Sequence, residues 1–327
     1  MTNTHSIKTT LLLTATQLKT QGFDAETAKL EVQLLLQHTL NVNRAWLISH
    51  QNDALQPNIH ATYRALINRR IKGEPIAYIL GVREFYGLHL KVSPDTLIPR
   101  ADTETLVDAV LAKISSSQSF PRKRESMLNL NQKMDSRFRG NDEISNVADD
   151  KQRLHILDLG TGSGAIALAI AKHRPQAFVT ATDACKAALN VAIENSENLQ
   201  IANVKFVLGD WFSALNQQNS PQKFDVIVSN PPYIEAADDH LTQGDLRFEP
   251  LSALASGADG LDDIREIITQ APKHLNPHGY LLLEHGYNQA EKVVTLLKQA
   301  GFNDIETIKD LGGNNRVTMG KISKSSF

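Results

Sequence analysis

The chain has 327 residues, 41% of them hydrophobic, and its 34 Lys and Arg nearly balance its 36 Asp and Glu. This length predicts two domains, and the formal net charge of −2 argues against direct nucleic-acid binding, which would need many cations against phosphates. The single cysteine, Cys185, excludes a disulfide framework and a Cys-rich metal site, and we expect it to be a small packing residue at a turn. Because no signal peptide and no membrane-length apolar run is visible, we expect a cytoplasmic monomer without membrane contact.

Residues 1–73 predict a small helical domain. Leu30, Leu34 and Leu35 recur at helical spacing on one segment. The domain ends at the basic stretch Arg69–Gly73, which is typical of a helix C-terminus with cations in the last turn and a glycine cap. Contact with an RNA-bound partner is the alternative interpretation of this basic stretch.

Residues 74–100 predict a linker built on a β-hairpin. The stretch Ile76–Val92 has strand character, with a turn near Glu84–Gly87. Thr96–Arg100 is expected to be extended, because a residue before proline avoids the helical region. Asp102 then begins a helix.

Residues 115–150 interrupt the periodic pattern. They begin with a serine run and carry mixed charge without sustained helical or strand spacing. We interpret them as a disordered insertion that loops outward. A basic tether for nucleic acid is the alternative, although acids such as Asp135 and Glu143 dilute its charge.

The rest of residues 101–327 alternates between strand and helix patterns, which predicts a mostly parallel sheet with helices on both faces. The expected strands are Leu154–Leu159, Phe178–Thr182, Val204–Leu208, Phe224–Ser229, Tyr280–Glu284, Ile305–Ile308 and Val317–Met319. The expected helices are Ala165–Lys172, Ala187–Glu197, Leu261–Ala271 and Gln289–Ala300. Since no helix separates the last two strands, one edge strand should be antiparallel.

A glycine-rich loop connects the first of these strands to its helix. It consists of Gly160, Thr161, Gly162, Ser163 and Gly164. Glycines let the backbone approach a ligand closely, and the helix N-terminus offers free N–H groups. Asp183 ends the next strand, where a carboxylate can accept hydrogen bonds from both hydroxyls of a ribose. An NAD-binding site remains an alternative, because Gly160, Gly162 and Ala165 also satisfy the dinucleotide fingerprint.

An acid and a flat ring follow the third strand of this sheet. Asp210 could bind the exocyclic amine of an adenine, and Trp211 could pack against its face. A polar turn with core aromatic residues explains this pair equally well.

The stretch Asn230–Tyr233, Asn-Pro-Pro-Tyr, follows the fourth strand directly. The two prolines, Pro231 and Pro232, make a stiff extended loop, which lies at the strand ends where such sheets bind ligands. The Asn230 side-chain oxygen and the Pro231 carbonyl could each accept one hydrogen of a planar –NH₂ group, and Tyr233 could stack on it. Such an amide nitrogen needs no strong base before attack, since it becomes acidic only once alkylated. The loop alone leaves amide and adenine substrates open.

The chain resembles the bacterial release factor glutamine N5-methyltransferases, the PrmC or HemK family. The motifs that carry the resemblance are Gly73–Gly81, Glu84–Gly87, Leu97–Arg100, Leu157–Gly164, Asp183, Gly209–Phe212, Asn230–Tyr233 and Arg247–Leu254. The first three make the match specific, because Asn-Pro-Pro-Tyr also occurs in DNA adenine methyltransferases. The long 115–150 segment and the polar, Gly-rich Gly312–Arg316 stretch depart from the family pattern.

The resemblance implies a Rossmann-like class I methyltransferase domain over residues 101–327, with 1–73 recognising class-I peptide chain release factors. It implies S-adenosylmethionine as cofactor and the glutamine of a Gly-Gly-Gln motif as substrate. The residues implied for the cofactor are Gly160, Thr161, Gly162, Ser163, Gly164, Asp183, Asp210, Trp211 and Asn230, and Asn230, Pro231, Pro232 and Tyr233 would hold the glutamine amide. N6-adenine methylation of DNA or RNA is the alternative activity.

Overall fold

The computed structural model describes residues 5–117, 153–215 and 222–323, and most of the expected insertion lies outside them. The N-terminal region consists of α1 (Ile7–Thr20), α2 (Ala25–Leu40), α3 (Arg44–Ser49) and α4 (Pro57–Ile71). The side chains of Ser6, Asp24 and Asn43 accept backbone N–H hydrogen bonds at the first three helix starts, which satisfies donors that a helix leaves unpaired. These helices surround a hydrophobic core of their own that includes the fully buried Leu35 and Tyr63.

The predicted hairpin is present, but it is shorter than expected. Its strands are β1 (Val82–Phe85) and β2 (Leu88–Lys91), paired antiparallel. The preceding residues form the short helix α5 (Ile76–Leu80) and not a strand. A five-residue apolar run has no decisive periodicity; here Pro75 begins the helix, and Gly81, with φ of +72°, ends it.

The large sheet has seven strands among the described residues, in the order β5-β4-β3-β6-β7-β9-β8. These strands are β3 (His155–Leu159), β4 (Phe178–Asp183), β5 (Val204–Leu208), β6 (Phe224–Ser229), β7 (Leu275–Glu284), β8 (Phe302–Lys309) and β9 (Asn315–Ile322). The predicted mostly parallel sheet is confirmed. The antiparallel strand is β9, however, and it lies between β7 and β8. The predicted edge position of the antiparallel strand was wrong. The second strand of the β8–β9 hairpin pairs with β7, which leaves β8 at the edge of the sheet.

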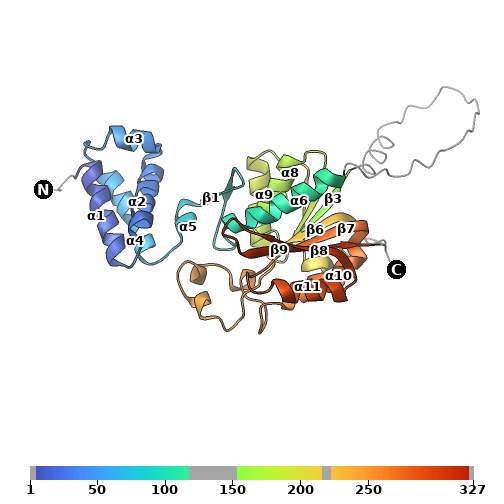
Figure 1. The fold of residues 1–327 in the computed structure, drawn as a ribbon. Helices are drawn as coiled ribbons and strands as arrows, with labels where there is room; N and C mark the ends of the chain where they lie inside the picture. The colour runs from blue at the N-terminus through green and yellow to red at the C-terminus, as the bar shows by residue number, and fades with distance from the viewer. Residues whose placement is uncertain (1–4, 118–152, 216–221, 324–327) are drawn as a thin grey trace, which may run out of the picture.

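Helices cover both faces of this sheet (Figure 1). One hydrophobic cluster joins residues of α6 (Glu104–Ser117) and α8 (Ala165–His173) to Ile156 and Val228. The other joins α10 (Asp262–His274) and α11 (Ala290–Gln299) to Leu157 and Ile227. Adjacent strand residues therefore face opposite cores, which explains the continuous apolar runs of β3 and β6.

The chain reverses direction across the sheet at β3. From β3 it proceeds through β4 to β5 on one side, and β6 then pairs with β3 on the other side. The crevice at the carboxyl ends of strands beside such a switch point is the usual ligand site in open α/β sheets. The loops after β3, β4 and β6 all meet there, and α9 (Lys186–Asn198) follows β4.

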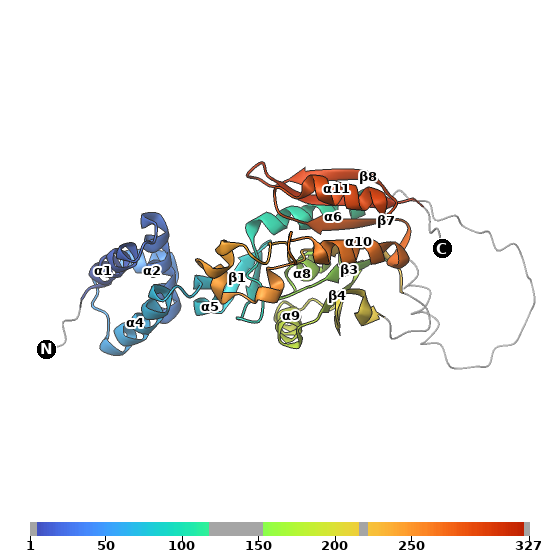
Figure 2. The ribbon, with the colours of Figure 1, turned by 90° about the horizontal axis from the view of Figure 1, so that it is seen from below.

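Residues 234–257 form a segment of 3-10 turns that reaches the N-terminal region, shown in orange in Figure 2. Within it, Asp245 forms an ion pair with Arg70 at 3.0 Å, and Arg247 donates a hydrogen bond to the Lys72 carbonyl at 3.0 Å. Phe248 packs against the hydrophobic cluster that contains Tyr78 of α5. The segment thus connects α4 and the linker to the sheet. No helix in the described part of the chain combines the length and apolarity needed to cross a membrane.

Candidate active site

A cavity of about 360 Å³ opens at the carboxyl ends of β3, β4 and β6. This volume is within the range of small-molecule binding sites. Of the residues predicted from sequence, it is lined by Gly160, Gly162, Asp183, Asp210, Trp211, Asn230 and Pro232. Thr161, Ser163, Gly164, Pro231 and Tyr233 are not in its wall. The structure therefore brings the three predicted clusters together around one cavity.

Three members of the glycine-rich loop shape the loop and do not line the cavity. The Thr161 hydroxyl donates to the buried Asp158 at 2.6 Å. The Ser163 carbonyl accepts from the Asn195 side chain at 2.9 Å. Gly164 begins α8 with φ of +84°, and a Cβ there would lie 3.1 Å from Ala192. Close helix packing thus requires glycine at position 164.

Asp183 is held in place by backbone donors at the end of β4. Its Oδ2 accepts from the Gly162 N–H at 2.7 Å, and its Oδ1 accepts from the Cys185 N–H at 2.8 Å. Burial raises the pKa of this carboxyl, and the two N–H bonds oppose that effect. Each carboxylate oxygen has more than one acceptor direction, so Asp183 can still accept hydrogen bonds from a ligand in the cavity.

Trp211 packs against the glycine loop. A Cβ at Gly160 would lie 3.2 Å from its six-membered ring. Trp211 itself has φ of +39° and begins a 3-10 turn, Trp211–Leu215. The preceding Gly209 cannot be replaced without movement, since a Cβ there would lie 2.6 Å from the Ala214 backbone. This turn places Asp210 and Trp211 in the cavity wall.

Asn230 has one satisfied and one unsatisfied side-chain group. Its Nδ2 donates to the Thr103 hydroxyl at 3.3 Å. Its Oδ1 is buried and has no hydrogen-bond partner among the described residues. An unpaired buried acceptor is costly in a folded protein, and Asn230 is one of the residues that line the cavity.

Tyr233 points away from the cavity toward buried Glu284 at the end of β7. Its hydroxyl donates to Glu284 Oε1 at 3.3 Å. Burial, together with the Glu284 charge, raises the pKa of Tyr233 above its ordinary value. Burial also raises the pKa of Glu284 to about 7, although Thr103, Arg316 and Tyr233 oppose this rise. Sequence reasoning missed Glu284, because its position beside the loop depends on the pairing of β6 with β7.

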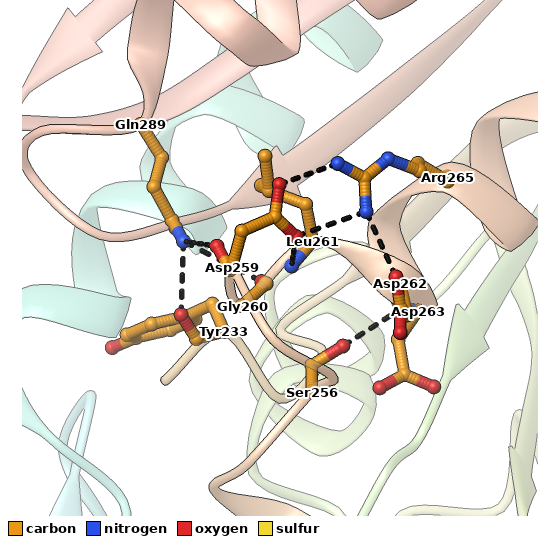
Figure 3. A network of polar contacts seen from close by, with 9 residues as sticks. All are labelled: Tyr233, Ser256, Asp259, Gly260, Leu261, Asp262, Asp263, Arg265 and Gln289. Carbon is orange, nitrogen blue, oxygen red and sulfur yellow. Dashed lines mark hydrogen bonds and ion pairs between the residues drawn. The ribbon is translucent and has the colours of Figure 1, made fainter. Parts of the chain in front are cut away.

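The carbonyl of Tyr233 is anchored by Gln289, as Figure 3 shows. Gln289 Nε2 donates to that carbonyl at 2.9 Å and lies 3.4 Å from the carbonyls of Asp259 and Gly260. Its Oε1 accepts from the Gly286 N–H at 2.8 Å. One buried amide thus connects the Asn-Pro-Pro-Tyr loop to the turns at 259–260 and 286.

Part of the cavity wall comes from two segments to which the sequence assigned no binding residues. They contribute Pro94, Asp95, Thr96 and Leu97 from the linker, and Pro250, Ser252 and Ala253 from the 234–257 segment. Glu249 connects the two segments, since its buried carboxylate accepts hydrogen bonds from the Ile98 N–H at 2.9 Å and from Arg100. Burial raises the pKa of Glu249, while Arg100 and the Ile98 N–H lower it.

Cys185 differs from its predicted role. It is exposed, precedes α9 and lines the cavity, so it is not a packing residue. Sequence alone could not place it, because a strand-to-helix turn at a switch point faces the crevice and not the core. Among the described residues, no group of His, Cys, Asp and Glu side chains is arranged to hold a metal ion.

Comparison with known proteins gives matches over both parts of the chain. Residues 150–319 match a methyltransferase domain family, and residues 11–81 match the PrmC N-terminal domain. Release factor glutamine methyltransferase from Xylella fastidiosa (strain Temecula1) is 43% identical over 90% of this chain and 93% of its own length. The protein of that name from Escherichia coli is 40% identical over 91% of this chain and 93% of its own length.

The chain belongs to the release factor glutamine methyltransferase family. This confirms the resemblance that the linker and loop motifs indicated, and with it the methyltransferase activity class and the predicted fold class. Among solved structures, the N-terminal domain of human METTL16 in complex with SAH aligns with a TM-score of 0.46 and 16% identity over 72% of this chain and 76% of that chain.

Proposed function

We propose that this enzyme transfers the methyl group of S-adenosylmethionine to the side-chain amide nitrogen, N5, of the glutamine in the Gly-Gly-Gln motif of class-I peptide chain release factors. The names of its relatives support release factors as the substrate. The single observation that best supports an acceptor with a planar –NH₂ group, such as a glutamine amide, is the buried Asn230 Oδ1, which has no hydrogen-bond partner among the described residues, on a residue that lines the cavity.

The residues of the cavity are chemically suited to S-adenosylmethionine. Asp183 offers carboxylate oxygens for ribose hydroxyls, and the glycine loop leaves room for close approach. Asp210 and Trp211 lie in the same wall, where an acid and an indole suit an adenine amine and ring. When bound, the cofactor would supply an electrophilic methyl group.

The Asn-Pro-Pro-Tyr loop would position the nucleophile. An amide –NH₂ carries two hydrogens, and Asn230 Oδ1 with the Pro231 carbonyl could accept one each. Holding both N–H groups fixes the nitrogen and directs it at the methyl group, which replaces a random encounter by an oriented one. The amide nitrogen would lose one hydrogen as a proton after alkylation, so no strong base is required before attack.

The proposal is tested by incubating the full chain with radiolabelled S-adenosylmethionine and either a class-I release factor or DNA containing adenine. We expect label only in the release factor, on the Gly-Gly-Gln glutamine, and no label when that glutamine is replaced by alanine. Label in DNA would instead support the N6-adenine alternative. Label in the alanine variant of the release factor would rule out the proposed acceptor.

A further inference from the structure

The Asn-Pro-Pro-Tyr loop has few backbone donors with which to fix its own position. Pro231 and Pro232 have no N–H group, so neither can donate to a neighbouring segment. Beyond the loop, the chain is tied down at Ile234, whose N–H donates to the Leu254 carbonyl at 2.9 Å. Between the end of β6 at Ser229 and Ile234, the position of the loop therefore depends largely on groups that donate to it from other elements.

Gln289 supplies such a donor. It lies just before α11 and is 6% exposed. Its Nε2 donates to the Tyr233 carbonyl at 2.9 Å, and its Oε1 accepts from the Gly286 N–H at 2.8 Å. Because a backbone N–H can only donate and a carbonyl can only accept, these partners allow one orientation of the Gln289 amide. Its donor side faces the loop.

The surrounding turn brings further acceptors to the same point. The carbonyls of Asp259 and Gly260 lie 3.4 Å from Gln289 Nε2 (Figure 3). A Cβ at Gly260 would be 2.3 Å from the Tyr233 carbonyl oxygen, and the turn is held by an ion pair of Asp259 with Arg265 at 2.5 Å. Three carbonyl oxygens directed at one point repel each other unless a donor lies between them. The Gln289 –NH₂ group is that donor.

We infer that Gln289 is a positioning residue for methyl transfer, because its amide sets where the Asn-Pro-Pro-Tyr loop ends and thereby where Asn230 Oδ1 and the Pro231 carbonyl lie. Gln289 is not in the cavity wall, so it acts through the loop. The inference rests on the proposed function, since it assumes that these two oxygens hold the glutamine amide. Loss of the donor should misplace the acceptor and leave the cofactor site intact.

Gln289→Glu is the sharpest test, because a carboxyl group is a donor only when it is protonated. The neutral acid can accept from the Gly286 N–H and donate to the Tyr233 carbonyl, as the amide does. The carboxylate cannot donate, and it brings a negative charge to the carbonyl oxygens. Burial raises the pKa of such a glutamate above its ordinary value of about 4.3. The kcat of this variant relative to wild type should therefore rise as the pH falls from 8 to 6.

The ratio to wild type removes the titrations that both proteins share. The charged and titratable groups on the elements that meet at Gln289 are Glu284, His285, Asp259, Asp262, Arg265, Glu291 and Lys292. Gln299→Glu is the matched control, since it places the same charge at the exposed last residue of α11. Its kcat relative to wild type should not change with pH.

Gln289→Met supplies a second variant, which keeps a similar size and removes both hydrogen bonds at every pH. We expect Gln289→Met, and Gln289→Glu at pH 8, to lower kcat for release-factor methylation ten- to a hundredfold, since a misplacement of about 1 Å at a reacting group can cost about a hundredfold. The Kd for S-adenosylmethionine, measured by calorimetry, and the KM for release factor should stay within about threefold of wild type, because neither depends on how the acceptor nitrogen is aimed.

A constant kcat ratio for Gln289→Glu across this pH range, or a wild-type kcat for Gln289→Met, would rule out the inference while the proposed function stands. If wild type itself does not label the release-factor glutamine, the proposed function fails. Loss of the folded state by circular dichroism, or a parallel loss of cofactor binding, would also contradict the inference, because Gln289 would then support the whole fold and not the loop alone.

Discussion

At the scale of single residues, burial makes the acids of this site unlike acids in water. Asp158 is a fully buried residue of β3, and burial raises its pKa to about 7, although the Thr161 hydroxyl opposes the rise. The Asp183 pKa is raised for the same reason, but its two backbone donors support the charged form. The two aspartates thus differ in how strongly their surroundings support the charged form, because different hydrogen-bond donors contact each carboxylate.

Asp158 should make the stability of the fold depend on pH. Its pKa is raised in the folded chain, so the stabilising contribution is present below about pH 4 and is lost as pH rises through about 7. The free energy of unfolding of Asp158→Asn minus that of wild type should therefore increase by at least about 1 kcal/mol as the pH rises from 5 to 8. Thermal unfolding midpoints of both proteins at several pH values measure this, and a constant difference would contradict it.

Asn230 should be essential to methyl transfer and dispensable for folding. Its side chain makes one 3.3 Å hydrogen bond, and its oxygen has no partner among the described residues, so Asn230→Ala removes little native contact. We expect the rate of release-factor methylation to fall at least about a hundredfold, the cost of losing orientation at the reacting group. Circular dichroism and the unfolding midpoint should stay close to wild type. Full activity in this variant would rule out the proposed role of the loop.

At the scale of elements, the Asn-Pro-Pro-Tyr loop is held in place by residues later in the chain. Ile234 forms a bridge to Ala255, and the Gln289 amide binds the Tyr233 carbonyl between the 259–260 turn and the start of α11 (Figure 3). Gly260 lies so close that a Cβ would be 2.3 Å from the same carbonyl. The stiffness of the loop thus comes from its prolines and from these contacts together.

Gly260→Ala should displace the loop and reduce activity. The added methyl would collide with backbone at a residue whose φ is +72°, so both strain and displacement are expected. We expect kcat to fall more than tenfold. Gly313→Ala is the matched control, since its φ is +84° and nothing lies within 4 Å of a Cβ there; it should lose about 1 kcal/mol of stability and keep its kcat. Parallel measurements of kcat and unfolding midpoint separate the two effects, and equal kcat in both variants would contradict the loop displacement.

At the scale of the whole molecule, the N-terminal region contacts the rest through α4, the linker and the 234–257 segment (Figures 1 and 2). Arg70 is central to this contact. It is 5% exposed, pairs with Glu31 at 2.8 Å and with Asp245 at 3.0 Å, and stacks over Phe23. The segment that it contacts also supplies Pro250 and Ser252 to the cavity wall, which connects the N-terminal helices to the site.

The two ion pairs of Arg70 should differ greatly in their effect on stability. Arg70→Met leaves the buried Glu31 without its partner and should lower the free energy of unfolding by about 3–5 kcal/mol. Asp245→Asn removes a pair whose acid is 40% exposed, and it should cost less than about 1 kcal/mol. Urea unfolding of both variants measures the difference. Glu31→Gln combined with Arg70→Met should recover part of the loss, and similar costs for the two single variants would contradict this account.

Local patterns alone determined the strand and helix order from His155 onward, the glycine loop and the strand-to-loop junction at Asn230. These signals depend on neighbouring residues, through hydrophobic periodicity and proline stiffness. The sequence did not reveal α5, the internal place of β9 or the exposure of Cys185. It also could not show that Thr103, Glu284 and Gln289 surround the loop. These positions depend on which distant strands pair and on what burial leaves for each side chain to bind, and only the tertiary structure decides both.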